Sequence, residues 1–411
     1  MLTAPKGESP LMTQPIFIVQ ASSRSWSGGP DLCMNPVEGQ PAVVRTIARA
    51  LEVFPKSRLI VVAPEFDREG SLDKLVAEQF GQRVQIHYGQ NDSPLNRMLA
   101  ATASLPDETY LIRVDGVHFC FDTDAPRAML QQALRDNLDT VKFPDDFPVQ
   151  FGCDVYRLGA LRILDRMLNT DEDRVFRVHP KFFQFAHPQD FNCAYTETLP
   201  EYTEDYLHAC RKRARAIYAI PRLEVNDQRL WVGDQLSFHY ELASRFLTPS
   251  MKVLDIACGD GYGARLLSGQ VAEIHGGDID AENVQHARNL TTQLNVKIHV
   301  EDVTATSFPD EHFDAVLSLE TIEHVDAIAC IRELSRILRP NGILILSTPQ
   351  NRLGKIPINT AHQREYSLDE IKEICENCFT VREIIGIKAG RIVIEDDPIG
   401  SNIVLICEKP T

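Results

Sequence analysis

The sequence predicts an α/β protein with two domains, and three observations lead to this fold class. Its 411 residues exceed the length of one average domain. Two stretches, residues 15–195 and 232–411, each alternate short apolar runs of strand type with amphipathic runs of helix type, which is typical of sheets covered by helices. The segment between them, residues 196–231, contains the charged run TEDYLHACRKRARAIYAI followed by Pro221, so we expect a helical linker there.

The first stretch opens with an apolar strand at residues 16–19, followed by a loop rich in serine, glycine and proline. Val44, Ile47 and Leu51 then recur at the spacing of one helix face. The elements expected after this helix are a strand at 59–63, a helix at 72–80, and strands at 84–88 and 110–114, the last of which runs into Asp115.

The second stretch begins with an amphipathic helix, GDQLSFHYELASRFL, at residues 233–247. Helices are expected between the strands that follow, one with Val284, Ala287 and Leu290 on one face and another with Ile328, Ile331, Leu334 and Leu338. The strands predicted from apolar or alternating runs lie at 252–256, 272–276, 296–300, 313–318 and 343–346.

The charge and the cysteines restrict the partners and the compartment. A formal net charge of −16 argues against a nucleic-acid partner or an anionic membrane surface, since both need a basic face. No apolar run approaches the roughly 18 residues of a membrane span. Ten cysteines without a repeating frame indicate reduced thiols, so we expect a cytoplasmic protein. The CxxC pair Cys375 and Cys378 lies near the end of an expected helix and has no second pair, so we predict no metal site.

A glycine-rich turn joins the strand at 252–256 to the next helix. Its sequence, Gly259-Asp260-Gly261-Tyr262-Gly263, lets a ligand approach the backbone at a helix N-terminus. The turn also fits the G-x-G-x-x-A pattern of dinucleotide-binding folds, with Asp278 about 20 residues further on to hold a ribose. By itself the turn therefore leaves two classes of cofactor open.

Acidic residues at successive strand ends separate these classes. Asp255 would repel a pyrophosphate but suits an ammonium group. Asp278 can accept hydrogen bonds from both hydroxyls of a ribose, and Asp302 is placed to accept one from an adenine amino group. The carboxyl ends of the strands in an open α/β sheet line one crevice, and Glu320 follows the fourth strand. The pattern favours a cationic cofactor that carries an amino-acid tail.

The segments VLDIACGDGYG, GGDID, VEDVTATSFPDEHFDAVLSLETIEHV and LRPNGILILSTPQN resemble, in order, the motifs of class I S-adenosylmethionine-dependent methyltransferases. The resemblance covers residues 232 to 410 and implies a Rossmann-like, seven-stranded domain with S-adenosyl-L-methionine as cofactor. Asp280 departs from the family pattern, in which many members have serine or proline. The cofactor-binding positions that the resemblance implies are Asp255, Ala257, Gly259, Gly261, Asp278, Ile279, Asp302, Val303, Leu319 and Glu320.

Two histidines are candidates for the base that an oxygen or nitrogen acceptor can require. His324 follows the fourth strand in ETIEHV, and His362 follows the fifth in INTAHQREYS. We place His324 first, because the carboxyl end of its strand faces the transferred methyl group. Glu323 and Glu365 are expected to be solvated or structural. INTAHQREYS also resembles a segment of bacterial methyltransferases associated with cell-surface sugars.

The first stretch resembles the cytidylyltransferase-like domains of surface polysaccharide synthesis, which are sugar nucleotidyltransferases with a glycosyltransferase-A type fold. The likeness lies in IFIVQASSRSWSGGP, VEGQPAVVRTIARAL, YLIRVDGVHFCFD and FPVQFGCDVYRLGAL. Two departures predict that the domain is not catalytic. No lysine joins Arg24 in the first loop, and Val117 stands where a metal-holding aspartate is expected, flanked by Asp115 and Asp122.

We therefore predict a methyltransferase for a sugar, nucleotide-sugar or surface-glycan intermediate, whose N-terminal domain aids recognition. One alternative is a bifunctional sugar nucleotidyltransferase–methyltransferase. Another is a methyltransferase for a small lipophilic acceptor such as a quinone precursor. A third is a protein that binds the cofactor and methylates nothing. The acceptor atom and the oligomeric state stay open.

Overall fold

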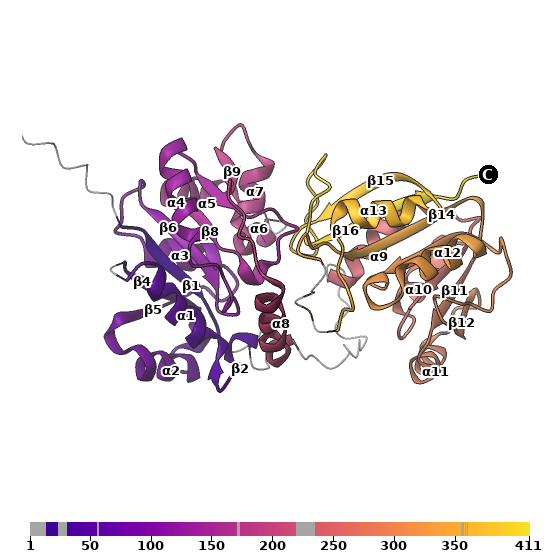
Figure 1. Cartoon of the computed structure of the whole chain (residues 1–411), viewed down its shortest axis with the longest axis horizontal. Helices are drawn as coiled ribbons and strands as arrows, with labels where there is room; N and C mark the ends of the chain where they lie inside the picture. The colour runs from indigo at the N-terminus through magenta and orange to yellow at the C-terminus, as the bar shows by residue number, and fades with distance from the viewer. Residues whose placement is uncertain are drawn as a thin grey trace, which may run out of the picture. The chain divides into compact units, whose positions relative to one another are not determined.

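The chain forms two compact units, which Figure 1 colours along the sequence. The computed structural model describes residues 14–23, 31–55, 57–170, 173–218, 235–354, 357, 359 and 361–411. The N-terminal unit comprises residues 1–144, 149–203 and 216–218, and the C-terminal unit comprises residues 145–148, 204–215 and 219–411. Within the predicted linker, helix α8 spans Glu204–Tyr218, and residues 219–231 lie outside the described residues.

The N-terminal unit is built on a seven-stranded sheet with the order β5-β4-β1-β6-β8-β7-β9. Strand β8 runs antiparallel to β6 and β7, and the other pairs of neighbours are parallel. Its strands are β1 (Ile16–Gln20), β4 (Leu59–Pro64), β5 (Val84–Gly89), β6 (Tyr110–Asp115), β7 (Thr140–Lys142), β8 (Asp154–Arg157) and β9 (Cys193–Tyr195), and β2 (Pro36–Val37) and β3 (Gln40–Pro41) form a separate pair.

Helices and buried strands make the core of this unit. Every residue of β4 is buried, and so is all but the last residue of β1 and of β6, as expected for strands covered on both faces. Val44 and Ile47 of the first helix are buried as the periodicity predicted. The helices are α1 (Ala42–Val53), α2 (Ser71–Phe80), α3 (Pro94–Ala101), α4 (Ala125–Asp136), α5 (Leu158–Met167), α6 (Arg174–Val178) and α7 (Pro180–Ala186).

The C-terminal unit has a second seven-stranded sheet, with the order β12-β11-β10-β13-β14-β16-β15. The first five strands of this order are parallel, and β16 runs antiparallel between β14 and β15. This arrangement confirms the Rossmann-like sheet that the sequence motifs implied. The strands are β10 (Lys252–Ile256), β11 (Glu273–Asp278), β12 (Val296–Val300), β13 (Phe313–Leu319), β14 (Leu338–Pro349), β15 (Thr380–Ile387) and β16 (Asn402–Glu408).

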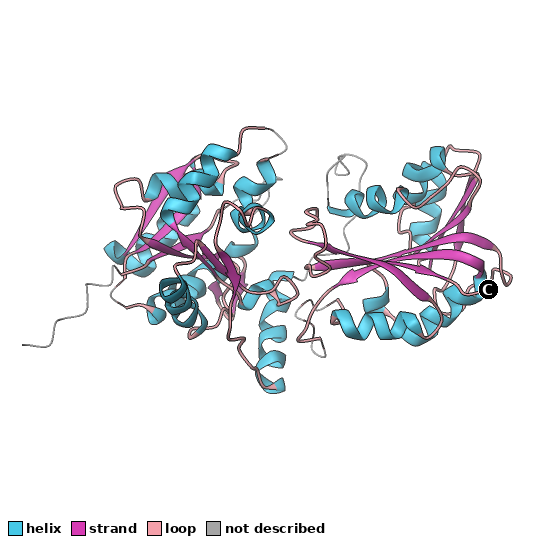
Figure 2. Cartoon of the chain, turned by 90° about the horizontal axis from the view of Figure 1, so that it is seen from above, coloured by secondary structure: helices cyan, strands magenta, loops and turns pink. Residues whose placement is uncertain are grey.

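Helices cover both faces of this sheet, as Figure 2 shows. One apolar cluster joins the sheet to α12 and α13, and another joins it to α9, α10 and α11. The prediction that Ile328 belongs to the buried face of α12 is wrong, because Ile328 is 41% exposed while the smaller Ala327 and Cys330 pack inward. The helices are α9 (Gln235–Ser244), α10 (Tyr262–Leu267), α11 (Ala281–Leu290), α12 (Ala327–Ile337) and α13 (Leu368–Glu376).

The strand order fixes where a ligand can bind. Strand β10 lies between β11 and β13, so the chain leaves β10 toward one side of the sheet and later returns to its other side. In open α/β sheets, a crevice opens at such a switch point, beside the carboxyl ends of the strands. Within the described part of the chain, every helix is too short or too polar to cross a bilayer.

Candidate active site

The glycine turn after β10 has the backbone conformation that its sequence requires. Gly261 has a φ of 74°, in the left-handed region that favours glycine, and it immediately precedes α10. A Cβ atom added to Gly263 would lie 1.9 Å from the ring of Tyr240, so a side chain larger than hydrogen would displace that ring. Ala257 is also left-handed, with a φ of 62°, although it carries a Cβ. The chain therefore turns sharply between the strand and the helix.

Asp278 connects this turn to the end of β11. Its Oδ2 accepts a hydrogen bond from the Gly259 amide at 2.9 Å, and its Oδ1 accepts one from the Asp280 amide at 2.9 Å. Each carboxylate oxygen has a second lone pair, so the side chain can still accept from ribose hydroxyls. Asp280 caps α11 by accepting from the amides of Glu282 and Asn283, which explains why an acid is stable at this position.

Asp255 lies inside the protein, beside the turn. Its carboxylate is 1% exposed and accepts from the Tyr240 hydroxyl, which lies 3.2 and 3.3 Å from its two oxygens. Burial raises the pKa of Asp255 from 3.8 to about 7. This carboxylate is therefore only partly ionised near neutral pH, and a cation beside it would favour its charged form.

Four further predicted positions lie at the ends of β11, β12 and β13. Oδ1 of Asp302 accepts from the Thr304 amide and hydroxyl, at 2.8 and 2.7 Å, and these bonds lower the pKa of Asp302. Val303 is buried and Leu319 is half-buried, whereas Ile279 is 64% exposed. Ile279 thus presents a large apolar side chain on the surface next to Asp278.

Glu320 follows β13 and contacts side chains that the sequence did not single out. Its Oε1 accepts from the Ser347 hydroxyl at 2.9 Å, and its Oε2 accepts from the Asn402 amide at 2.7 Å. The Nε2 atom of His239 lies 3.9 Å from Glu320 Oε1. His239 is 4% exposed, and among the described residues neither of its ring nitrogens has a hydrogen-bond partner. The only feature of the sequence that could have indicated His239 is its position in the amphipathic helix before the glycine turn.

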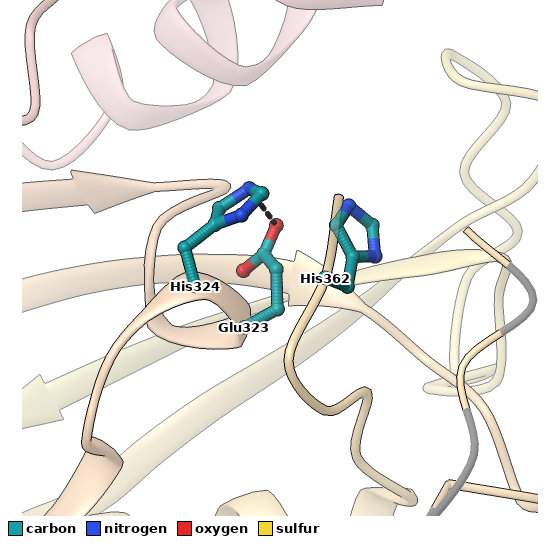
Figure 3. Close-up of side chains that lie close together, drawn as sticks. All are labelled: Glu323, His324 and His362. Atoms are coloured by element: carbon teal, nitrogen blue, oxygen red, sulfur yellow. Dashed lines mark ion pairs between the residues drawn. The ribbon is translucent and has the colours of Figure 1, made fainter. Parts of the chain in front are cut away.

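The two candidate histidines lie side by side, in one cluster with Glu323 (Figure 3). His324 ends a short 3₁₀ helix, Ile322–His324, that follows β13, and His362 comes from the loop after β14. Their ring centroids are 4.9 Å apart, with the rings nearly perpendicular. The sequence offered the two histidines as alternatives for the role of base, and the structure brings them together.

Hydrogen bonds fix both rings. Nδ1 of His324 lies 3.1 Å from the carbonyl oxygen of Ala361. Nδ1 of His362 lies 2.6 Å from Oε1 of Glu365, whose Oε2 accepts from Asn351 at 2.7 Å. Carbonyl and carboxylate oxygens only accept, so both Nδ1 atoms carry the hydrogen and donate it. Glu365 therefore positions His362, as a structural role predicts.

Glu323 was expected to be solvated or structural, and its burial leaves only the second of these alternatives. Its side chain is 1% exposed, and Oε2 accepts from the Thr348 hydroxyl at 3.0 Å. Burial, followed by the negative charge of Glu320, raises the pKa of Glu323 well above its usual value. The residue was missed as a candidate because a glutamate in a polar segment, ETIEHV, usually faces solvent.

Comparisons with known proteins identify this domain. Residues 254–346 match the family described as "Methyltransferase domain". A probable S-adenosylmethionine-dependent methyltransferase of Mycolicibacterium smegmatis is 34% identical over 152 residues, 35% of this chain and 58% of that protein. A ubiquinone biosynthesis O-methyltransferase of Azorhizobium caulinodans is 34% identical over 134 residues (31% and 53%), and a 2-methyl-6-phytyl-1,4-hydroquinone methyltransferase of Synechocystis sp. is 35% identical over 117 residues (28% and 37%).

The C-terminal unit contains a class I methyltransferase domain. This assignment implies S-adenosyl-L-methionine as the cofactor. The chain spans 58% of the length of the first of these relatives and less of the other two. Each of the three matches covers 35% of this chain or less, so the relatives do not account for the whole chain. The family match begins at residue 254, so it does not include the N-terminal unit.

Outside the methyltransferase domain, the predicted acids of the N-terminal unit have different surroundings. Asp115 ends β6, where Arg113 Nη2 lies 3.2 Å and His118 Nε2 lies 3.8 Å from its carboxylate oxygens. Asp122 accepts from the amides of Asp124 and Ala125, so its carboxylate holds the turn that leads into α4. Arg24 lies outside the described residues.

Proposed function

We propose that the methyltransferase domain transfers the methyl group of S-adenosyl-L-methionine to a hydroxyl group of a small-molecule or glycan acceptor. The observation that carries this proposal is the row of acids at the carboxyl ends of β10, β11, β12 and β13, beside the glycine turn. In this assignment Asp255 holds the ammonium group, Asp278 the ribose hydroxyls and Asp302 the adenine amino group. Ala257, Gly259, Gly261, Ile279, Val303, Leu319 and Glu320 form the rest of the cofactor site.

The reaction is an in-line displacement at the sulfonium methyl group. The acceptor oxygen bonds to the methyl carbon while the carbon–sulfur bond breaks, and S-adenosylhomocysteine leaves with the bonding electron pair on sulfur. The protein mainly positions the two reactants and excludes water. The acceptor must also lose its proton. His324 is our candidate for accepting it, because its Nδ1–H donates to Ala361 and its Nε2 therefore has a lone pair.

For the acceptor we favour a sugar, nucleotide-sugar or surface-glycan intermediate. The support is the resemblance of INTAHQREYS to sugar-associated methyltransferases and of the N-terminal unit to cytidylyltransferase-like domains. In this proposal the N-terminal unit binds the acceptor or a partner and catalyses nothing itself. A second candidate is a lipophilic phenol, because two relatives are named as ubiquinone and hydroquinone methyltransferases.

Label transfer from methyl-labelled cofactor tests the proposal. The full chain would be incubated with a panel of nucleotide-sugars and a panel of dihydroxy-aromatic acceptors. Label in a nucleotide-sugar supports the first acceptor class, and label in an aromatic acceptor supports the second. Calorimetric titration with S-adenosyl-L-methionine and with NAD checks the cofactor first. Binding of NAD in preference to S-adenosyl-L-methionine would sink the proposal.

A further inference from the structure

The cluster of Glu323, His324 and His362 contains the donor atoms of a metal site. Each residue offers one nitrogen or oxygen atom, and the three atoms lie within 4.8 Å of one another. Bonds of about 2.1 Å from one ion to three ligands would hold those ligands about 3–4 Å apart, so small side-chain rotations suffice. Figure 3 shows the Glu323 carboxylate between the two rings.

Both imidazoles are held as metal-binding histidines usually are. A histidine that binds a metal normally donates its other ring N–H to a carboxylate or a backbone carbonyl. His324 donates to the Ala361 carbonyl and His362 donates to Glu365, in each case from Nδ1. The lone pair of each ring therefore lies on Nε2. Nε2 of His362 lies 3.0 Å from Asn359 Nδ2, so it accepts a hydrogen bond from that amide. Binding of an ion to Nε2 would displace the Asn359 amide.

A cation would stabilise the acidic residues around the cluster. Glu320, Glu323 and Glu365 lie close together, and Glu323 and Glu365 are buried. Among the described residues, the only ion pairs of these three acids are with His239, His324 and His362. Carboxylates without a lysine or arginine partner are costly to bury, and a divalent ion would compensate their charge. The His324 side chain is 41% exposed, so an ion can enter from solvent.

We propose that Glu323, His324 and His362 bind a divalent transition-metal ion, with positions left open for the acceptor hydroxyl. Two imidazoles and one carboxylate suit Zn²⁺, Fe²⁺ or Mn²⁺, and three protein ligands leave room for a substrate oxygen. Glu365 and the Ala361 carbonyl are then the groups that orient the ligands. This assignment replaces the expectation that the chain has no metal site.

The position of the site agrees with a role in methyl transfer. This part of the inference rests on the proposed function. The cluster lies at the carboxyl ends of β13 and β14, next to Glu320 and on the edge of the sheet that carries the cofactor acids. An ion there would lower the pKa of a bound hydroxyl. With an ion bound, the hydroxyl proton would pass to solvent, and the lone pair of His324 Nε2 would bind the ion in place of accepting that proton.

Metal titration of the full chain tests the site without any acceptor. Tag-free protein, freed of metal with a chelator, would be titrated with Co²⁺ and with Zn²⁺, following the visible absorption of Co²⁺ and the heat of binding. We expect one ion per chain in the wild type. His362→Ala and Glu323→Gln should each weaken it by more than about 100-fold, because loss of an outer-shell partner alone typically costs about 10–100-fold. Glu365→Gln removes only such a partner and should weaken metal binding by about 10–100-fold.

His286→Ala removes an exposed histidine of α11 and should leave the titration unchanged. Because the ligand variants can fail to fold, X-ray absorption of the Zn²⁺-loaded wild type gives an independent measurement, expected to show two imidazole ligands. No bound ion, or equal affinity in the wild type and both ligand variants, would overturn the assignment. Cofactor titration of the same samples separates the two proposals: metal binding without S-adenosyl-L-methionine binding supports the site and contradicts the proposed methyl transfer.

Discussion

Lowering the pH from 7 to 5 should weaken the binding of S-adenosyl-L-methionine, because the carboxylate that we assign to its ammonium group takes up a proton in this range. Burial holds the pKa of Asp255 at about 7 in the cofactor-free protein. The ammonium group binds the ionised carboxylate, so the proton and the cofactor compete. The cofactor's own amino group, with a pKa of about 7.7–8.0, stays charged below pH 7.

The size of the effect follows from the fraction of Asp255 that is ionised. With a pKa of about 7, that fraction is about one half at pH 7 and about one hundredth at pH 5. The dissociation constant should therefore rise about 50-fold over this range, which is about 2 kcal/mol of binding free energy. An ordinary aspartate, with a pKa of about 3.9, would cause almost no change over the same range.

Calorimetric titrations at constant ionic strength between pH 5 and 7 measure this dependence. The Asp255→Asn variant should bind the cofactor weakly at every pH, and it should lack the acid limb, which is the rise of the dissociation constant between pH 7 and pH 5. Asp369→Asn, at an exposed position of α13, serves as the matched control and should keep the limb. A wild-type dissociation constant that stays flat from pH 7 to 5, or an acid limb that survives in Asp255→Asn, would refute the assignment of Asp255.

The same raised pKa predicts that Asp255→Asn stabilises the cofactor-free protein. Stability contributed by the protonated carboxyl is complete below pH 3.8 and is lost as the pH rises to about 7. At pH 8 the free energy of unfolding of the variant, measured with denaturant, should therefore exceed that of the wild type by up to about 4 kcal/mol. A lower denaturant midpoint in the variant than in the wild type would contradict this. Asp278→Ala should weaken cofactor binding by about 1.5–3 kcal/mol, and unchanged affinity in calorimetry would remove the ribose assignment. His324→Ala should slow single-turnover methylation by about 10²–10⁴ with little change in cofactor affinity, and a loss below about tenfold would exclude it as base and as ligand. Pyrophosphate release from CTP, UTP, GTP or ATP with magnesium should stay at background, whereas release abolished by Asp115→Asn would show that the N-terminal unit is catalytic.

The sequence was sufficient for most strands of the two sheets and for the row of acids at the carboxyl ends of β10 to β13, because both depend on local patterns. It did not predict β7, β8, β9, β15 or β16. Strand β11 was predicted at 272–276 and lies at Glu273–Asp278, so its predicted end falls two residues short, and Asp278 still lies at its carboxyl end. The acids at the ends of β10, β11 and β12 could be read in order, since a parallel sheet brings such ends together. The buried face of α12 was predicted only in part, because an apolar side chain such as Ile328 can remain on the surface when smaller residues fill the core.

The histidine cluster could not be predicted in the same way, because it depends on loops. His362 is separated from His324 by α12, β14 and the loop after β14, and no periodicity fixes where such a loop returns. Glu323 looked like a surface residue in a polar segment, and only the packing of Thr348 against it reveals its burial. The role of Glu365 likewise depends on its contacts with His362 and Asn351, which no sequence spacing specifies.

Features that cost stability gather at one edge of the methyltransferase sheet. Ala257 and Glu320 are non-glycine residues with φ values of 62° and 51°, and each directly follows one of the adjacent strands β10 and β13. The buried carboxylates of Asp255 and Glu323 lie at the same strand ends. Left-handed backbone and buried charge each cost free energy unless a ligand compensates them, and such features concentrate where ligands bind. A cationic cofactor beside Asp255 and a metal ion beside Glu323 would each supply that compensation, so both proposals explain why this edge is built from residues that destabilise the empty protein.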